Sequence, residues 1–123
     1  TFVAGFIGSP PMNLQTGQAT GQRFDIGGQV LDLPVPSPRN GELVMGLRPE
    51  HTSLGAATGW PAQVELVEML GAERLVHCRL GTKLFTVRVD GTLKPPKHGD
   101  QVKLTASPDH LHWFDAQTGQ RVT

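Results

Sequence analysis

Alternating apolar and polar residues predict strands through the second half of the chain. The alternation is clear at Val76–Leu80, at Leu84–Val89 and at Gln101–Ala106, and a period of two residues is that of a strand with one buried face. His110–Asp115 is a further, aromatic strand candidate. Trp60–Leu70 is apolar with imperfect alternation. A long strand and a short helix both fit this segment, and we favour the strand.

The first half of the chain is richer in turn residues. We expect three short strands before residue 34, at Met12–Leu14, Gln22–Ile26 and Gln29–Leu33. The expected turns between them are Thr16-Gly17, Thr20-Gly21 and Gly27-Gly28. The prolines of Pro34–Gly41 keep that segment out of a central strand, and Glu42–Leu47 is the next predicted strand. Thr52–Gly59 is small, polar and contains glycine, so we expect a mobile loop there.

Short apolar runs between frequent turns indicate an all-β fold. The 15 glycines and 10 prolines among 123 residues disfavour long helices, and the length suits one domain with a real core. Thr1–Ile7 has apolar residues at helical spacing, and the prolines that follow would end a helix there. We therefore expect an antiparallel β-barrel or sandwich of about eight short strands, with a short N-terminal helical stub.

Charge and composition exclude several classes of protein. The chain has eleven basic and eleven acidic side chains, hence no formal net charge, which disfavours a nucleic-acid-binding module. The single cysteine, Cys78, allows no internal disulfide and suits a reducing compartment. No stretch approaches the ~20 apolar residues of a membrane-spanning helix. The start at Thr1, without Met or a signal-peptide pattern, reads as the interior of a longer chain.

Recognisable catalytic motifs are not found. The sequence has no Gly-x-x-x-x-Gly-Lys-Ser/Thr loop, so we expect neither ATP binding nor catalysis from this chain. His110 and His112 would face one side of a strand, but no nearby ligand set completes a metal site, and a structural role is favoured. Cys78 falls on the apolar face of its strand, which favours a buried, inert thiol. Trp113 and Phe114 are interpreted as core or interface residues rather than base-stacking groups.

The segment Gly46-Leu47-Arg48-Pro49-Glu50-His51 is the main candidate site. Pro49 fixes its own φ and pushes Arg48 towards an extended conformation, so the preceding strand must end or bend here. In an extended segment Arg48 and Glu50 point to the same side and are able to pair. An exposed pair of this kind contributes roughly 0–1 kcal/mol. Taken alone, these six residues favour a structural interpretation.

Five segments in order resemble one protein family. They are Phe2–Asn13, Gly46–His51, Val64–His77, Gly99–Leu104 and His112–Arg121. Together they are similar to the C-terminal regulatory region of the ATP-binding subunits of carbohydrate-type ABC importers, the maltose and glycerol-3-phosphate group. Each segment is weak evidence alone, but the similarity spans nearly the whole chain. Trp113 departs from the family pattern, because an aliphatic residue is usual at that position.

The resemblance implies a fold and a division of the chain. Residues 1–9 would be the tail of an upstream ATPase-domain helix and its linker, and residues 10–123 an OB-like regulatory barrel, often called a transport-associated OB or TOBE domain. ATP and Mg²⁺ would bind in the upstream domain, which is absent here, so the fragment itself would hold no cofactor and catalyse nothing. The family would place the subunit in the cytoplasm, at the inner face of the plasma membrane.

The resemblance also implies partners and a role for the candidate residues. The partners would be a second copy of the subunit, the ATPase domain, the transporter's membrane subunits, and a regulatory protein or small effector. The interface or regulatory candidates are Arg48, Pro49, Glu50, His51, Trp113, Phe114 and Asp115. We expect Arg48 to be neutralised by Glu50 or Asp115 and to set the geometry of the following loop. A small-ligand or oxyanion-sensing barrel and an OB-type nucleic-acid module remain alternatives.

Overall fold

The described residues form ten strands and two single-turn 3-10 helices. The computed structural model describes residues 11–55, 57–91 and 94–123. The strands are β1 (Asn13–Thr20), β2 (Arg23–Asp25), β3 (Val30–Asp32), β4 (Gly41–Leu47), β5 (Thr52–Gly55), β6 (Trp60–Leu70), β7 (Glu73–Leu80), β8 (Lys83–Asp90), β9 (Gln101–Ala106) and β10 (His112–Asp115). The helices are η1 (Pro49–His51) and η2 (Pro108–His110). None of the described helices is long or apolar enough to cross a bilayer.

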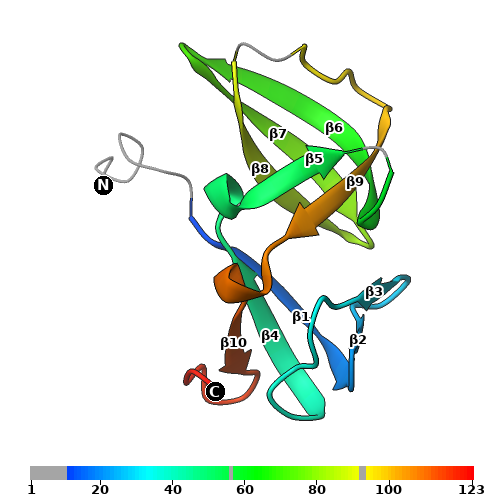
Figure 1. The fold of residues 1–123 in the computed structure, drawn as a ribbon, viewed down its shortest axis with the longest axis vertical. Coiled ribbons are helices and arrows are strands. Elements are labelled where there is room, and N and C mark those ends of the chain that lie inside the picture. Colours follow the sequence, from blue (N-terminus) through cyan, green and yellow to red (C-terminus); the bar gives the residue numbers. More distant parts are fainter. Residues whose placement is uncertain (1–10, 56, 92–93) are drawn as a thin grey trace.

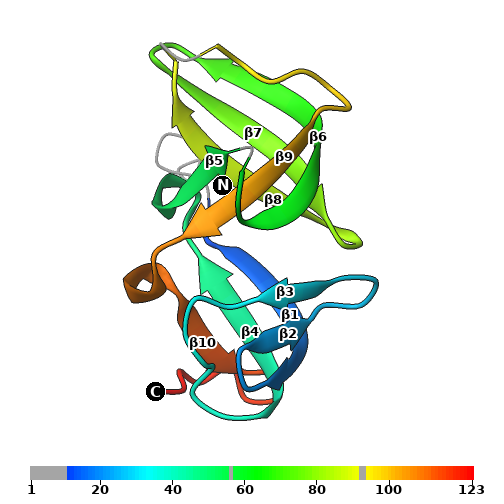
Figure 2. The same ribbon diagram turned by 45° about the vertical axis from the view of Figure 1, so that its right-hand side comes forward.

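The strands form two antiparallel sheets that lie end to end (Figure 1). The first sheet has the order β10-β4-β1-β2-β3 and the second the order β5-β9-β6-β7-β8. The second sheet curls so that its edge strands β5 and β8 approach each other, which gives it the shape of a partly open barrel (Figure 2). The chain passes from the first sheet to the second and back, because its last strand returns to pair with β4.

The observed strands confirm the all-β, antiparallel prediction and correct it in detail. Trp60–Leu70 is a strand with the predicted bounds. The Thr52–Gly59 prediction was partly wrong, because its first half is strand β5, paired with β9. The structure has ten strands in two sheets rather than about eight. The predicted helical stub at Thr1–Ile7 lies outside the described residues.

The turn predicted at Thr16-Gly17 was also wrong, because β1 continues through both residues. Gly17 is needed for close packing instead. A Cβ placed on Gly17 would lie 2.6 Å from the Asp25 carbonyl oxygen and 2.8 Å from the ring of Phe24. The side chain of Phe24 is fully buried, so it fills the space that the glycine leaves open. A glycine inside a strand often marks such a close approach of two chain segments.

One hydrophobic core extends through both sheets. Its buried members include Phe24, Leu31, Leu43 and Met45 from the first sheet and Val64, Val76, Leu80, Phe85, Val87 and Leu104 from the second. Cys78 is fully buried in this core, as predicted, and burial raises the pKa of its thiol to about 11. A thiol with so high a pKa is almost wholly protonated near neutral pH and therefore unreactive.

Hydrogen bonds outside the ladders tie the two sheets together. The side-chain amide of Asn13 in β1 donates to the carbonyl of Thr86 in β8 and accepts from the N–H of Thr86, each at 2.8 Å. Trp60 in β6 donates its indole N–H to the Asp32 carbonyl at 2.8 Å. Gln29 accepts from the Gly81 N–H at 3.0 Å. These bonds join segments far apart in sequence, so they fix how the sheets lie relative to each other.

Candidate functional site

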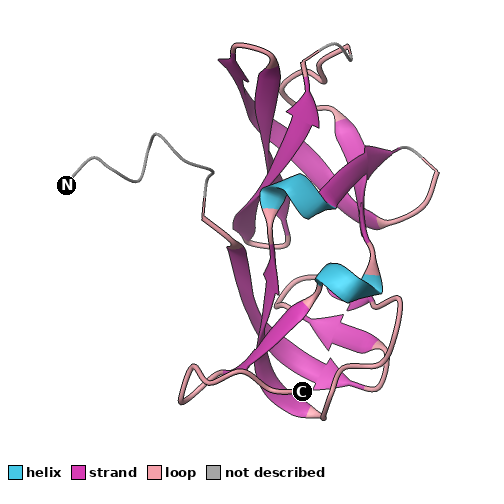
Figure 3. Cartoon of the chain, turned by 60° about the vertical axis from the view of Figure 1, so that its left-hand side comes forward, coloured by secondary structure: helices cyan, strands magenta, loops and turns pink. Residues whose placement is uncertain are grey.

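Two similar crossovers connect the sheets, and the Arg48–His51 motif forms the first. The chain leaves β4 through η1 to reach β5, and it leaves β9 through η2 to reach β10 (Figure 3). Both helices begin with a proline, Pro49 or Pro108, and the residue before each proline is extended. A proline suits the first helical position and disfavours the helical conformation in the residue before it. The motif therefore turns the chain between sheets.

The two crossovers contact each other through a pair of histidine rings. His51 of η1 and His110 of η2 stack with their ring centroids 3.8 Å apart and an interplanar angle of 14°. Nδ1 of His51 is buried and has no hydrogen-bond partner within the described part of the chain. The stack links two segments between which all five strands of the second sheet lie in the sequence. His51 was a predicted candidate residue, but no pattern in the sequence pairs it with His110.

The predicted ion pair of Arg48 with Glu50 or Asp115 is not found. The ion pairs among the described residues are Arg39–Asp115, Glu68–His77, Glu65–Arg79 and Glu73–Arg88, and both Arg48 and Glu50 are exposed. Side chains two residues apart point to the same side only in extended backbone, whereas Pro49 starts a 3-10 turn. The Arg48 carbonyl has the ordering role instead, since it accepts from the His51 N–H at 3.0 Å and the Thr52 hydroxyl at 3.2 Å.

Positive charges surround His112 at the end of the second crossover. Arg121 approaches Nδ1 of His112 with its Nη1 at 2.9 Å. Burial, followed by the charges of Arg121 and Arg48, lowers the pKa of His112. Because a ring nitrogen must be unprotonated to accept the Arg121 N–H, the contact and the lowered pKa both favour a neutral His112.

The three candidates of β10 have three different environments. Trp113 is buried and meets Phe24 edge-on, with the ring centroids 5.1 Å apart. Asp115 accepts the N–H groups of Gln117 and Thr118 at 2.8 and 2.9 Å. These bonds, more than the charge of Arg39, lower the pKa of Asp115. Phe114 points to the opposite side of the strand from Trp113, with the Arg121 guanidinium 5.5 Å above its ring centroid.

Phe114 belongs to an apolar surface on the solvent side of the first sheet. We define the outer face as Met12, Leu14, Val44, Gly46 and Phe114, which come from β1, β4, β10 and the residue before β1. A Cβ on Gly46 would lie 2.5 Å from the Met12 sulfur and 3.0 Å from the Phe114 ring. The glycine of the motif therefore lets these side chains close over the sheet. Leu14 is 57% exposed.

Neither Leu14 nor the role of Gly46 in this surface was predicted from the sequence. The predicted turn at Thr16-Gly17 cut β1 short and hid the alternation of Leu14 with the residues after it. With β1 drawn as one strand, Gln15 and Ala19 are buried and Leu14, Thr16 and Gln18 are exposed. That alternation is the signal that would have placed Leu14 on the solvent side.

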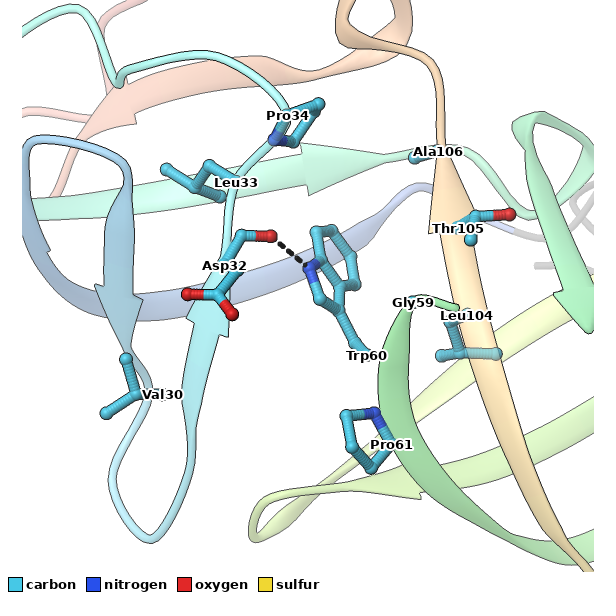
Figure 4. Close-up of a pocket in the computed structure, with 10 residues that line it drawn as sticks. All are labelled: Val30, Asp32, Leu33, Pro34, Gly59, Trp60, Pro61, Leu104, Thr105 and Ala106. Carbon is cyan, nitrogen blue, oxygen red and sulfur yellow. Dashed lines mark hydrogen bonds between the residues drawn. The ribbon is translucent and has the colours of Figure 1, made fainter. Parts of the chain in front are cut away.

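Cavities lie beside and between the sheets in the described part of the chain. One, of about 300 Å³, separates β3 from β6 and β9, and Trp60 and Asp32 line it (Figure 4). Its lining includes no basic side chain, so it is unsuited to a phosphate group. A second, of about 260 Å³, lies beside the His51–His110 stack. The third, of about 650 Å³, opens between β5 and β8. Among the described residues no three His, Cys, Asp or Glu side chains are placed to hold a metal ion.

Comparison with known families and proteins matches nearly the whole chain. Residues 45–114 match the model of the TOBE domain family, and residues 8–52 match the MalK OB fold domain. The chain is 43% identical over 134 aligned positions to the "sn-glycerol-3-phosphate import ATP-binding protein UgpC" of Bordetella avium, with 99% of this chain and 36% of that protein covered. The proteins of the same name from Bordetella pertussis and Cereibacter sphaeroides are 46% and 40% identical, with 99% of this chain covered in both and 36% and 35% of those proteins. The chain thus spans about a third of the length of these relatives.

Proposed function

We propose that this chain, which belongs to the TOBE domain family, is the C-terminal regulatory and dimerisation domain of the ATP-binding subunit of an ABC importer. Two observations support the assignment to an importer subunit: the printed names of the relatives and their coverage of 99% of this chain. The relatives' name makes sn-glycerol-3-phosphate the first solute to test, with sugars as the related class. The sequence contains no phosphate-binding loop, so this domain acts by binding rather than by catalysis.

The outer face is the observation that supports dimerisation. Leu14, which is exposed, and Val44 and Phe114, which are half-buried, lie together on the solvent side of one sheet around Gly46. A solvent-facing sheet surface is ordinarily polar at alternate positions, and contiguous exposed apolar side chains mark contact surfaces. The occupant that we propose for this face is the same face of a second subunit.

The charges along β4 favour a two-fold arrangement. Glu42, Val44 and Gly46 alternate with the buried Leu43 and Met45, so Glu42 lies towards one end of the outer face. The cations Arg48 and Arg121 lie towards the other end, next to His112. A two-fold axis near Val44 would place the acidic end of one copy against the basic end of the other. Isologous contacts require this kind of self-complementarity.

Two exposed leucines allow a matched test in the full-length subunit. Leu14 on the outer face is 57% exposed and Leu84 on β8 is 54% exposed, so Leu14→Arg and Leu84→Arg make the same chemical change at equally exposed strand positions. We expect Leu14→Arg to weaken subunit dimerisation at least about tenfold, which equals about 1.4 kcal/mol. Leu84→Arg should leave it unchanged. Sedimentation equilibrium measures both, and equal dimer affinities for the two variants would refute the assignment.

The remaining partners follow from the proposed subunit. ATP and Mg²⁺ would bind in the ATPase domain, and the membrane subunits of the importer would hold the complex at the cytoplasmic face of the plasma membrane. A regulatory protein or small effector would use surfaces left free by the dimer. The lack of net charge disfavours nucleic acid as a partner. Uptake of sn-glycerol-3-phosphate by cells that lack this subunit tests the transport assignment, which fails if uptake is unchanged.

A further inference from the structure

The third cavity opens between the two edge strands of the second sheet. It has a volume of about 650 Å³ and is lined by β5, by the end of β8 and by residues of the connection to β9. We call it the barrel mouth. Barrel mouths are frequent places for ligand sites, and pockets of about 300–1,000 Å³ are typical of them. The barrel mouth does not include any residue of the outer face, so it would stay open in the proposed dimer.

The floor of the barrel mouth is aliphatic. Leu54, Val89 and Val102 line it, and each is half-buried against the core. These three side chains come from β5, β8 and β9, so the floor is built by strands from both sides of the opening. Such a floor favours an apolar side chain, because covering it removes further aliphatic surface from water.

The rim of the barrel mouth has charges of both signs. Glu50 of η1 and Lys94 of the connection to β9 both line it and are exposed. Neither takes part in the ion pairs found among the described residues, although the charge of Glu50 acts on Arg88. Arg88 and Asp90 also line the rim, but the Arg88 guanidinium is bound by Glu73 and Asp90 has an interaction of its own within the chain. A ligand with one cationic and one anionic group would therefore find a partner for each, Glu50 for the cation and Lys94 for the anion.

The walls of the barrel mouth are the free edges of β5 and β8, which expose main-chain N–H and C=O groups. In the described ladders β5 pairs with β9 alone and β8 pairs with β7 alone. The opposite edges of both strands face the opening, and a strand edge exposes N–H and C=O groups that another extended chain can bind. Sugars, phosphate and simple amines lack the alternating donors and acceptors of an extended peptide.

From these features we propose that the barrel mouth binds a short aliphatic peptide with free termini in an extended conformation. Its ammonium group would face Glu50, its carboxylate Lys94, and one aliphatic side chain would contact the floor. Main-chain hydrogen bonds to the edge of β5 would orient it. This inference goes beyond the dimerisation role and does not depend on it, because the two surfaces share no residue.

Gly55 offers a way to block the barrel mouth without disturbing the fold. It lines the cavity, its φ is outside the left-handed region, and a Cβ placed on it meets nothing within 4 Å. Gly55→Phe therefore directs an aromatic ring into open space. Ala57→Phe is the matched control, because Ala57 is an exposed residue two positions further on, in the connection that follows β5, and it does not line the cavity.

The test is calorimetric titration of the full-length subunit with tri-leucine. We expect a dissociation constant at or below about 1 mM, at least tenfold weaker binding to Gly55→Phe, and unchanged binding to Ala57→Phe. Tri-leucine amide lacks the carboxylate, so it should bind the wild type more weakly than tri-leucine does. Lys94→Gln should weaken the binding of tri-leucine but leave the binding of tri-leucine amide unchanged. Circular dichroism of each variant checks that it is folded.

Three outcomes would overturn the proposal. The first is no binding of tri-leucine at millimolar concentration to the folded subunit. The second is equal binding to the wild type and Gly55→Phe. The third is saturable binding of sn-glycerol-3-phosphate or inorganic phosphate that is lost in Lys94→Gln, because that would assign the barrel mouth to a small anion. None of these results changes the dimer affinities of the Leu14 and Leu84 variants, so the two proposals fail separately.

Discussion

Adding one methyl group at Gly46 tests whether Met12 and Phe114 close over the sheet as the structure shows. In Gly46→Ala the new Cβ would lie 2.5 Å from the Met12 sulfur and 3.0 Å from the Phe114 ring. Overpacking costs about 1–3 kcal/mol, and replacing a strand glycine returns about 0.5–1 kcal/mol. The net expectation is a loss of about 0–2.5 kcal/mol in the free energy of unfolding.

Whether a second substitution can restore the lost stability depends on which atom the new Cβ meets. The Met12 sulfur is near the end of a flexible side chain, so Met12→Ala should relieve much of the clash. The double variant should then show a favourable coupling of at least about 0.5 kcal/mol relative to the two single variants. Gly17→Ala has no such rescue, because its Cβ meets the Asp25 main-chain oxygen at 2.6 Å and the buried Phe24 ring. We expect a loss of about 3 kcal/mol there.

Urea unfolding of the chain measures all of these values. The control is Gly55→Ala, where the added Cβ meets nothing within 4 Å. That substitution should be neutral or stabilise by up to about 1 kcal/mol, because alanine restricts the unfolded chain. Two results would contradict the described packing of Met12 and Phe114 over Gly46. One is a Gly46→Ala variant as stable as Gly55→Ala, and the other is a Met12→Ala change whose effect on the free energy of unfolding simply adds to that of Gly46→Ala.

Three further predictions concern the other contacts. Trp60→Phe removes the indole donor to the Asp32 carbonyl and part of a buried ring, and it should lower the free energy of unfolding by about 1–3 kcal/mol in urea. His51→Ala and His110→Ala should be coupled by about 0.5–1.5 kcal/mol in a double-mutant cycle, because either change alone removes the ring stack. The folded-state pKa of Asp115 lies below the ordinary value of 3.8, so its contribution is present above about pH 4 and is lost as pH falls further. The stability difference between the wild type and Asp115→Asn should therefore shrink below about pH 4, and a difference that grows in acid would contradict this.

Local sequence patterns predicted the long regular strands well. Trp60–Leu70 and Gln101–Ala106 have the predicted bounds in the structure. The alternation of apolar and polar residues predicted Gln101–Ala106, whereas the imperfect alternation of Trp60–Leu70 also fitted a short helix. Thr52–Gly55 lacks that pattern and becomes a strand because β9 lies beside it. Strand formation there depends on tertiary pairing more than on local preference.

The candidate site was predicted as a segment but not as a set of contacts. Pro49 correctly predicted that the preceding strand ends or bends, yet the 3-10 turn that it begins separates the Arg48 and Glu50 side chains that an extended segment would align. Asp115 pairs with Arg39, 76 residues away. His51 meets His110 only because the two crossovers lie against each other. Such pairings depend on the order of strands in two sheets, which no local window contains.

Charge reversal across the proposed two-fold contact tests the dimerisation role most directly. Glu42→Arg and Arg48→Glu, made singly in the full-length subunit, should each place like charges opposite each other. Because a two-fold axis makes this exposed contact occur twice, each variant should weaken the dimer affinity roughly 2- to 30-fold. The double variant exchanges the two charges and should return to near the wild-type affinity by sedimentation equilibrium. A double variant weaker than both single variants, or three affinities equal to the wild type, would contradict the account.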